Sequence, residues 1–329
     1  TVYLHDGQSS VAQDLEPEYI AISPDGEKAW VTLQENNAIA VIDIASAGVD
    51  KIIALGVKDH NIPGNELDAS DRDDGINIRS WPVKGMYMPD SIASFEVGGN
   101  SYYITANEGD SREYDAFVEE KRFKDVPKDS DITDLDIFGL DAFEENEFLG
   151  RLLTTLTNDT DGDGDIDVPH TFGARSFSIW NADGDLVADS GNDFEVITAN
   201  ILGEDFNNNN DENVGDTRSD AKGPEPEAVA VGTVNGRTYA FVGLERTGGI
   251  MVYDVSNPFN PSFVQYTTNR DFSFDIEGDI DDGDMPAHVA GDLGPEGMIF
   301  VTAEDSPNGM PLVIVGNEVS GSTTIYQVD

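Results

Sequence analysis

The sequence contains no cysteine, so disulfide bonds and thiolate metal sites are not available to this protein. It has four histidines, and no His-x-x-x-His pair of the kind that binds catalytic zinc occurs among them. Neither a Gly-x-Ser-x-Gly elbow nor a Walker loop is present. The common signatures of zinc hydrolases, serine hydrolases and P-loop nucleotide-binding proteins are therefore all missing.

Basic residues are scarce: 18 Lys and Arg stand against 65 Asp and Glu, which gives a net charge of −47. Such a charge repels nucleic acids and anionic membranes, so neither is expected as a partner. No run approaches the ~20 apolar residues that a membrane span needs, and no signal peptide is recognisable. The acidity has two readings, a surface adapted to salty water and the binding of metal ions. An acidic chain without cysteine also fits an exported protein of a marine or salt-adapted bacterium, located in the periplasm, at the cell surface or outside the cell.

Four segments of the chain repeat one pattern, in which a Pro-acid pair precedes short apolar runs separated by turns. The pairs occur in Glu16-Pro-Glu18, Met88-Pro-Asp90, Gly223-Pro-Glu-Pro-Glu227 and Gly294-Pro-Glu296. The runs are rich in Val, Ile, Ala, Tyr and Phe, which favours strands, and Pro-Asp-Gly at 24–26 is a hairpin turn signal. The repeat predicts an all-β chain of antiparallel blades in a β-propeller, with a β-sandwich as the alternative.

We expect residues 1–329 to form one propeller domain with long insertions at about 58–87, 110–173 and 270–290. Four blades are visible in the sequence, and a closed ring of four is uncommon. The expectation is therefore a larger ring of about six or seven blades. Its remaining blades would precede this sequence or come from another chain.

The repeat also places acids at equivalent positions. The opening acids are Glu18, Asp90, Glu227 and Glu296, and the acids after the second strand are Glu35, Glu108, Glu245 and Glu318. The start of one strand and the end of its antiparallel neighbour lie at the same end of a blade, so these rim acids should surround one mouth of the propeller. Crowded carboxylates need protons, cationic partners or metal ions. The alternative is that each acid only caps its own turn.

The segment 159–167 has the composition of a calcium loop, with aspartates at alternate positions: Asp159, Asp161, Asp163, Asp165 and Asp167. Gly164 stands where such a loop turns sharply. His170 replaces the bidentate Glu of an EF-hand, and Pro169 disfavours the helix that would follow. The pattern therefore predicts Ca²⁺ binding outside a true EF-hand, with Asp167 or an acid from elsewhere completing the ligands.

A second segment, 205–216, also alternates oxygen ligands, at Asp205, Asn207, Asn209, Asp211, Asn213 and Asp216. It lacks the central glycine, although Asn210 tolerates the left-handed conformation. A second calcium loop and a solvated polar loop are both compatible with it. Weaker acidic patterns occur at 71–77 and 275–284.

Motifs along the whole chain resemble one family. They include DASDRDDGINI, ITANEGDSREY, GARSFSI, RSDAKGPEPEAV and NEVSGSTTIYQV. They resemble the choice-of-anchor I family of exported bacterial proteins, which is similar to mesenchyme-specific cell-surface glycoproteins and to propellers described as alkaline phosphatase-like or phytase-esterase-like. The resemblance implies a secreted or surface-anchored propeller with further propeller sequence before this segment. It does not identify catalytic residues.

Two functions remain open at this point. The first is a calcium-binding module for binding or assembly outside the cell, whose partners are metal ions and other chains of an extracellular assembly. The second is a calcium-dependent phosphoesterase in which metal ions at the mouth hold a phosphate ester and activate water. The residues available for that chemistry are Glu108, Arg112, Lys222, Glu227, Glu245 and Arg246.

Overall fold

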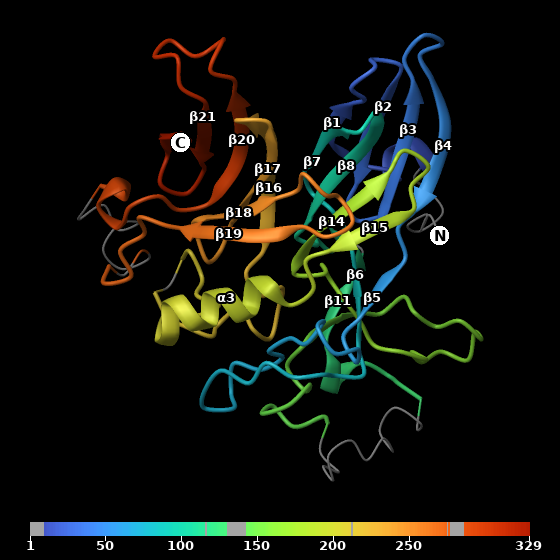
Figure 1. Cartoon of the computed structure of the whole chain (residues 1–329). Coiled ribbons are helices and arrows are strands. Elements are labelled where there is room, and N and C mark those ends of the chain that lie inside the picture. Colours follow the sequence, from blue (N-terminus) through green and yellow to red (C-terminus); the bar gives the residue numbers. More distant parts are fainter. Residues whose placement is uncertain (1–9, 116, 130–142, 212, 275, 277–285) are drawn as a thin grey trace.

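The computed structural model describes residues 10–115, 117–129, 143–211, 213–274, 276 and 286–329 (Figure 1). The first sheet has its strands in chain order: β1 (Pro17–Ile22), β2 (Lys28–Leu33), β3 (Ala38–Asp43) and β4 (Gly48–Ala54). All its pairings are antiparallel. The predicted Pro-Asp-Gly turn joins β1 to β2, and Gly26 adopts the positive φ of 74° that such a turn needs.

The third and fourth sheets repeat this arrangement. The third contains β16 (Pro226–Val234), β17 (Arg237–Leu244), β18 (Ile250–Asp254) and β19 (Ser262–Thr267). The fourth contains β20 (Pro295–Val301), β21 (Leu312–Asn317) and β22 (Ser322–Gln327). Both are antiparallel meanders, as the short apolar runs predict.

The second sheet is assembled from two distant parts of the chain. Its order is β15-β14-β8-β7, with β7 (Ile92–Val97), β8 (Asn100–Asn107), β14 (Ser176–Asn181) and β15 (Leu186–Asp189). The chain leaves after β8, forms a long excursion and returns to pair β14 with β8. After β15 it continues into the helix α3 (Asp193–Leu202).

The excursions form a layer below the blades (Figure 1). Their strands are β5 (Val57–Asp59), β6 (Lys84–Met86), β9 (Glu113–Tyr114), β10 (Phe117–Val118), β11 (Glu120–Arg122), β12 (Leu153–Thr155) and β13 (His170–Thr171). The described helical segments outside the blades are α1 (Val11–Asp14), η1 (Phe123–Asp125), η2 (Gly203–Asp205) and η4 (Ala287–Ala290). This layer has a core of its own, which includes Trp81, Phe123 and Leu152.

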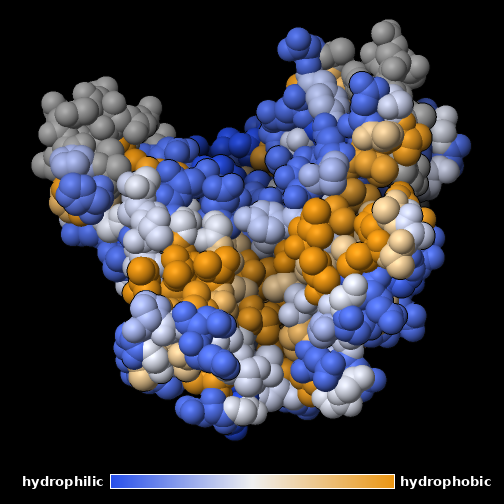
Figure 2. All heavy atoms as spheres, turned by 90° about the horizontal axis from the view of Figure 1, so that it is seen from above, coloured by the Kyte–Doolittle hydropathy of each residue, from blue (hydrophilic) through white to orange (hydrophobic). Residues whose placement is uncertain are grey.

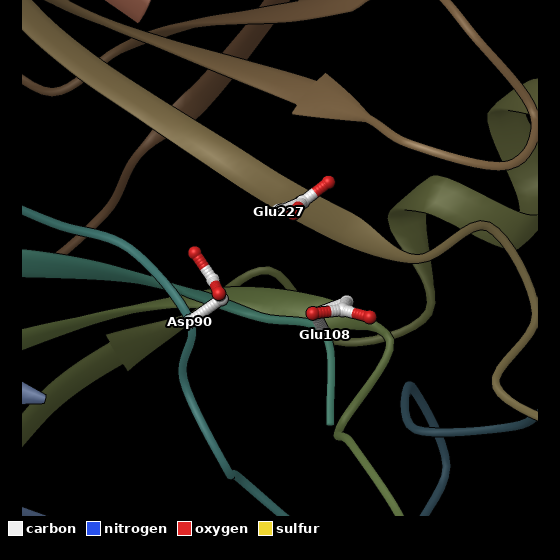
Figure 3. A group of neighbouring side chains, drawn as sticks. All are labelled: Asp90, Glu108 and Glu227. Carbon is white, nitrogen blue, oxygen red and sulfur yellow. The ribbon is translucent and has the colours of Figure 1, made fainter. Parts of the chain in front are cut away.

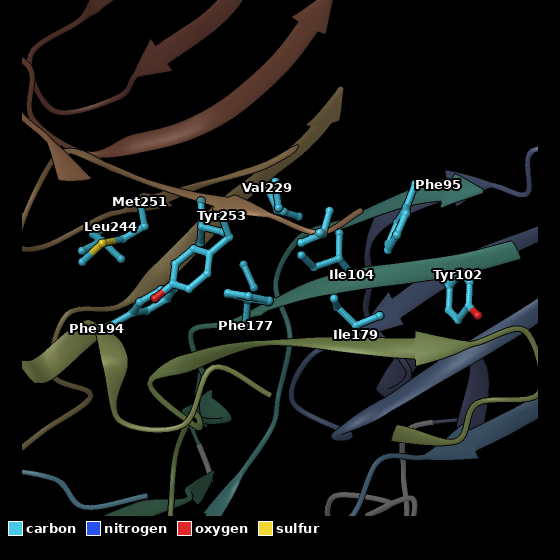
Figure 4. Close-up of a cluster of buried hydrophobic side chains, with 14 residues drawn as sticks. Phe95, Tyr102, Ile104, Phe177, Ile179, Phe194, Val229, Leu244, Met251 and Tyr253 are labelled. Carbon is cyan, nitrogen blue, oxygen red and sulfur yellow. The ribbon is translucent and has the colours of Figure 1, made fainter. Parts of the chain in front are cut away.

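The blades pack face to face in sequence order: β1 packs against β7, β7 against β16, and β16 against β20. The largest core cluster lies between the second and third sheets, where Ile104, Phe177 and Met251 are completely buried (Figure 4). This arrangement confirms the predicted all-β class and the four repeated blades. The size of the complete ring stays a prediction.

The two end sheets carry apolar residues on their outward faces. On the first sheet, Ile20 lies opposite Val31, Val31 opposite Ala40, and Ala40 opposite Ile52, so these four share one face. On the fourth sheet the corresponding row is Ile299, Ile314 and Ile325. Figure 2 shows hydrophobic residues gathered on either side of the middle of the molecule in this view. We call the outward faces of the first and fourth sheets the end faces.

A comparison of variants tests whether the end faces are uncovered in solution. Replacing Ile299 and Ile325, which are 58% and 61% exposed, with Thr should change the free energy of unfolding by less than ~0.5 kcal/mol per site. The buried control Ile104→Ala should cost about 2–5 kcal/mol. Urea unfolding gives both values, and binding of a hydrophobic dye should fall only in the Thr variant. A large loss of stability in the Thr variant would mean that the faces are covered in solution.

Candidate metal centre

Each blade begins with the same backbone kink. The residue before each Pro-acid pair has a positive φ: Glu16 at 42°, Met88 at 42°, Glu225 at 51° and Gly294 at 67°. A positive φ is unfavourable for a residue with a side chain, so three of the four blades hold strained backbone at this point. In the third and fourth blades, the kinked carbonyl accepts a hydrogen bond from the backbone of the acid after the second strand. These bonds join Glu245 N to Glu225 O at 2.7 Å and Glu318 N to Gly294 O at 2.8 Å.

Strand register brings the two acids of a blade to the same end. Pro226, which precedes Glu227, pairs with Leu244, which precedes Glu245. The fourth blade has the equivalent pair Pro295 with Asn317, which precedes Glu318. In the first blade Pro17 pairs with Leu33, which is followed by Gln34, so Glu35 lies one residue beyond the equivalent position. The recurrence of acids in the sequence is therefore a recurrence in space in the third and fourth blades.

Three of the predicted rim acids, from two adjacent blades, converge at the mouth. Asp90 precedes β7, Glu108 follows β8, and Glu227 lies at the start of β16 (Figure 3). One carboxylate oxygen from each lies within 4.8 Å of the others. That separation allows all three to contact one divalent cation. We call this group the mouth triad.

The mouth triad is costly when it is empty and ionised. Burial raises the pKa of Asp90 to about 8, and repulsion from Glu108 adds to the shift. Burial, together with Glu108 and Glu245, raises the pKa of Glu227 to about 11. Asp90 Oδ1 and Glu227 Oε2 are both buried without a hydrogen-bond partner. These two atoms need either a proton or a cation.

Glu108 also belongs to a second group with Glu225 and Glu245, whose oxygens likewise lie within 4.8 Å of one another. Here cations are present. Lys222 Nζ lies 2.6 Å from Glu108 Oε1 and 3.1 Å from Glu225 Oε2. Burial would raise the pKa of Glu225, but Lys222, Arg218 and Arg246 together lower it to about 2. This second group is an ion-pair network that adjoins the mouth triad, because Glu108 belongs to both.

The basic residues considered for catalysis all form ion pairs with acidic side chains. Arg112 is 2% exposed and forms ion pairs with Asp14 and Glu119, which are not rim acids. Lys222 is held by Glu108 and Glu225, as described above. Arg246 contacts Glu245 Oε1 at 3.0 Å and Glu225 Oε2 at 3.6 Å. All three cations are thus paired with the protein's own carboxylates.

The other rim acids differ in their surroundings. Burial raises the pKa of Glu35 to about 7, with repulsion from Glu16, Asp110 and Glu18. Glu296 lies close enough to raise the pKa values of Asp90 and Glu227. Glu318 is exposed and belongs to none of the carboxylate groups found among the described residues.

The predicted calcium loop is folded around its first aspartate. Asp159 Oδ1 accepts a hydrogen bond from Gly162 N at 2.6 Å, and its Oδ2 accepts one from Gly164 N at 3.0 Å. Oxygens of Asp159, Asp161 and Asp163 lie within 4.8 Å of one another. Gly164 has a φ of 105°, as a sharp turn requires.

The acid from elsewhere that this loop requires has a candidate in Asp129. Oxygens of Asp129, Asp163 and Asp165 lie within 4.8 Å of one another. Desolvation is the main cause that raises the pKa of Asp165 to about 6, and repulsion from Asp163 is the next. Repulsion from Asp129 and a hydrogen bond with it add to the shift. Asp167 instead turns its Oδ2 to the backbone and hydroxyl of Thr160, at 2.6 and 2.7 Å.

The 205–216 segment is organised by arginines. Arg270 donates hydrogen bonds to Asn208 Oδ1 and to the backbone carbonyl of Asn209, and Arg246 donates one to Asn210 Oδ1 at 2.8 Å. Asp216 Oδ1 accepts a hydrogen bond from Ser219. The predicted ligands Asp205, Asn207, Asn209, Asp211 and Asp216 do not form a carboxylate group among the described residues. The geometry favours a loop held by internal cations. The run at 275–284 lies outside the described residues except for Ile276.

Sequence reasoning missed Glu225 and Asp129. Glu225 stands directly before the Pro226-Glu227 pair, and its equivalence to Glu16 in the first repeat was a usable signal. Asp129 had no signal, because its contact with the loop depends on an isolated bridge between Lys128 and Ile166.

A family model described as the choice-of-anchor I domain matches residues 2–258. The chain belongs to the choice-of-anchor I family. Gigasin-3a from Magallana gigas is 28% identical over 57% of this chain and 67% of its own length. A mesenchyme-specific cell surface glycoprotein from Strongylocentrotus purpuratus is 26% identical over 97% of this chain, which spans 44% of that relative.

Solved structures similar to this choice-of-anchor I chain include propellers. A periplasmic gluconolactonase from Pseudomonas aeruginosa aligns with a TM-score of 0.32 at 12% identity, over 95% of this chain and 66% of its own. The β-propeller domain of Cps50 from Myceliophteria thermophila aligns with a TM-score of 0.24 at 10% identity, over 95% of this chain and 84% of its own. These similarities are too low to support a functional argument. Among the described residues, no helix is long and apolar enough to cross a membrane.

Proposed function

We propose that this chain is part of an extracellular or cell-surface propeller that binds Ca²⁺ at the mouth triad and at the 159–167 loop. The bound cations would order a surface that holds another component of an extracellular assembly. The observation that carries the proposal is the convergence of Asp90, Glu108 and Glu227 from two blades, with buried oxygens of Asp90 and Glu227 left unpartnered. The cell-surface glycoprotein relative supports the location.

Calcium is the cation that these ligands favour. Both groups offer carboxylate oxygens, which suit hard divalent cations, and the chain has no cysteine ligand for softer metals. The loop supplies its oxygens from an irregular backbone in which Gly162 and Gly164 have positive φ. Ca²⁺ tolerates such irregular coordination, whereas Mg²⁺ demands nearly ideal octahedral geometry.

The geometry favours a binding module over a phosphoesterase. A phosphoesterase needs cations free to meet the phosphate as charge develops in the transition state. Lys222 and Arg246 instead form ion pairs with Glu108, Glu225 and Glu245, and Arg112 forms ion pairs with Asp14 and Glu119. Metal-bound water at the mouth triad would have to act without such help.

Calorimetric titration with Ca²⁺ tests the proposal and separates the two sites. The intact chain should show two classes of sites, and Asp161→Ala with Asp163→Ala should remove the class that belongs to the loop. The matched control is Asp183→Ala with Asp185→Ala, two exposed aspartates in the β14–β15 turn, which should titrate like the unaltered chain. Absence of Ca²⁺ binding up to millimolar concentration would contradict the proposal.

A further inference from the structure

An open polar cleft lies between residues of the second and third blades. Its volume is about 510 Å³, within the range of roughly 300–1,000 Å³ that is usual for small-molecule sites. Three parts of the chain form its walls: the loop 63–65, the segment from β15 to the start of α3, and the β18–β19 connection. None of the mouth triad or calcium-loop residues lines it.

An exposed aromatic ring stands at this cleft. Phe259 is 69% exposed, the highest value among the large hydrophobic residues of the described chain. Pro258 and Pro261 flank it, and Phe259 N donates a hydrogen bond to Asn257 Oδ1. The prolines restrict the backbone, so the ring is presented with little conformational freedom to lose on binding. The ring of Tyr102 lies edge-on to that of Phe259, with the two ring centroids 6.4 Å apart.

The polar side chains of the cleft are two carboxylates, three amides and two hydroxyls. Asp193 Oδ2 accepts the hydroxyl of Tyr253 at 2.9 Å, which fixes the carboxylate in the wall. Asn65 and Asn260 contribute amide groups to the lining. Asp189 also lines the cleft, and its charge is offset by Lys58 Nζ at 2.9 Å. The oxygens of Asp189 also accept hydrogen bonds from Ser176, Ser178 and Gly191 N. An anionic ligand would therefore be repelled by two carboxylates here, whereas a ligand hydroxyl could donate to Asp193.

We propose that this cleft binds a neutral sugar unit of a polysaccharide or glycan. The apolar C–H face of a pyranose would pack on Phe259, while its hydroxyls donate to Asp193 and exchange hydrogen bonds with the amides of Asn65 and Asn260. An exposed ring beside the carboxylate of Asp193, which Tyr253 holds in place, suits a ligand that has one apolar face and a polar rim. This site is independent of the proposed calcium sites, because it shares no residue with them.

Affinity electrophoresis in native gels tests the site with defined probes. The chain should be retarded by at least one of the neutral polysaccharides laminarin, dextran and galactomannan, and not by a sulfated polysaccharide. Phe259→Ala should weaken the apparent affinity at least tenfold, and Asp193→Asn should weaken it less. Retardation should persist in the presence of a chelator, which separates this result from the fate of the calcium proposal.

Two controls make the outcome decisive. Tyr19→Ala removes an exposed aromatic residue outside the cleft, and Asp185→Asn removes an exposed carboxylate outside it. Both should bind the probe like the unaltered chain. Melting curves establish that Phe259→Ala is folded. The proposal is overturned if no neutral probe retards the chain, or if folded Phe259→Ala binds as tightly as the original.

Discussion

Glu227→Gln should make the calcium-free protein more stable at pH 8, by on the order of 3 kcal/mol. In the folded chain, burial and neighbouring acids raise the pKa of Glu227 to about 11, whereas the unfolded carboxyl titrates near 4.5. At pH 8 the unfolded chain therefore releases a proton that the folded chain keeps, and this difference favours unfolding. Gln is neutral in both states and carries no such cost. Urea unfolding in the presence of a chelator measures the difference.

Raised carboxyl pKa values also determine how the stability of the calcium-free protein changes with pH. The pKa values of Asp90 and Glu245 are raised to about 8 and that of Glu35 to about 7. For each group the stability contribution is present below the unfolded pKa and is lost as pH rises through the folded pKa. Calcium-free stability should therefore fall between about pH 4.5 and pH 8. The lowered pKa of Glu225 acts in the opposite direction, but only below about pH 4.5.

With Ca²⁺ bound, the unaltered chain should be more stable than the Glu227→Gln variant. Ca²⁺ binds carboxylates, so binding at the mouth triad should expel protons, and Glu227→Gln should weaken it and reduce the number released. Calorimetry in two buffers of different ionisation enthalpy counts these protons. Glu318→Gln is the matched control, because Glu318 is an exposed rim acid outside the triad. Equal proton release in both variants would argue against a metal at the triad.

Arg175→Met is expected to cost about 3–5 kcal/mol, because it strands a buried charge. Arg175 is 3% exposed and forms an ion pair with Glu195, which is 1% exposed. Its guanidinium also donates to the backbone carbonyls of Asp68, Ser219 and Ala221. One side chain thus joins the start of β14, the helix α3, the excursion that contains Asp68 and the connection between α3 and β16. Urea unfolding monitored by tryptophan fluorescence measures the loss.

Two further variants isolate the cause of that loss. Arg237→Met removes an arginine that pairs with Asp254 at the surface, where the side chain of Arg237 is 67% exposed, and should cost ~1 kcal/mol or less. Arg175→Met combined with Glu195→Gln should recover part of the stability, because the stranded carboxylate is gone. If the double variant is no more stable than Arg175→Met, the backbone carbonyls carry most of the effect.

The blades could be predicted because each is a local repeat. The turns at 24–26, 98–99 and 235–236 lie between the first two strands of their blades. Glycine and asparagine there supply the positive φ that hairpins need. The third strand of the second blade could not be placed this way, because it follows the long excursion. The segment GARSFSI carries β14, yet nothing in its composition says which sheet it joins.

The positions of the candidate site residues could be predicted, but the pairing of their charges could not. The acids at equivalent repeat positions gave the mouth residues Asp90, Glu108 and Glu227. The sequence did not show which acids already have cations. Lys222 and Arg218 lie near Glu225 in sequence, but Arg270 reaches the 205–216 segment from about sixty residues away. Long-range pairing of this kind depends on the packed structure.

The excursion inside the second blade also dictates an order of assembly. The first, third and fourth blades are built from consecutive hairpins, whose ends meet after short loops close. The second blade is completed only when Ser176 returns to Asn107, and closing a longer loop costs more chain entropy. Contacts between such distant segments form slowly. During synthesis the first blade can therefore fold while its neighbour is still an open hairpin. The core between the second and third blades must be the product of late steps.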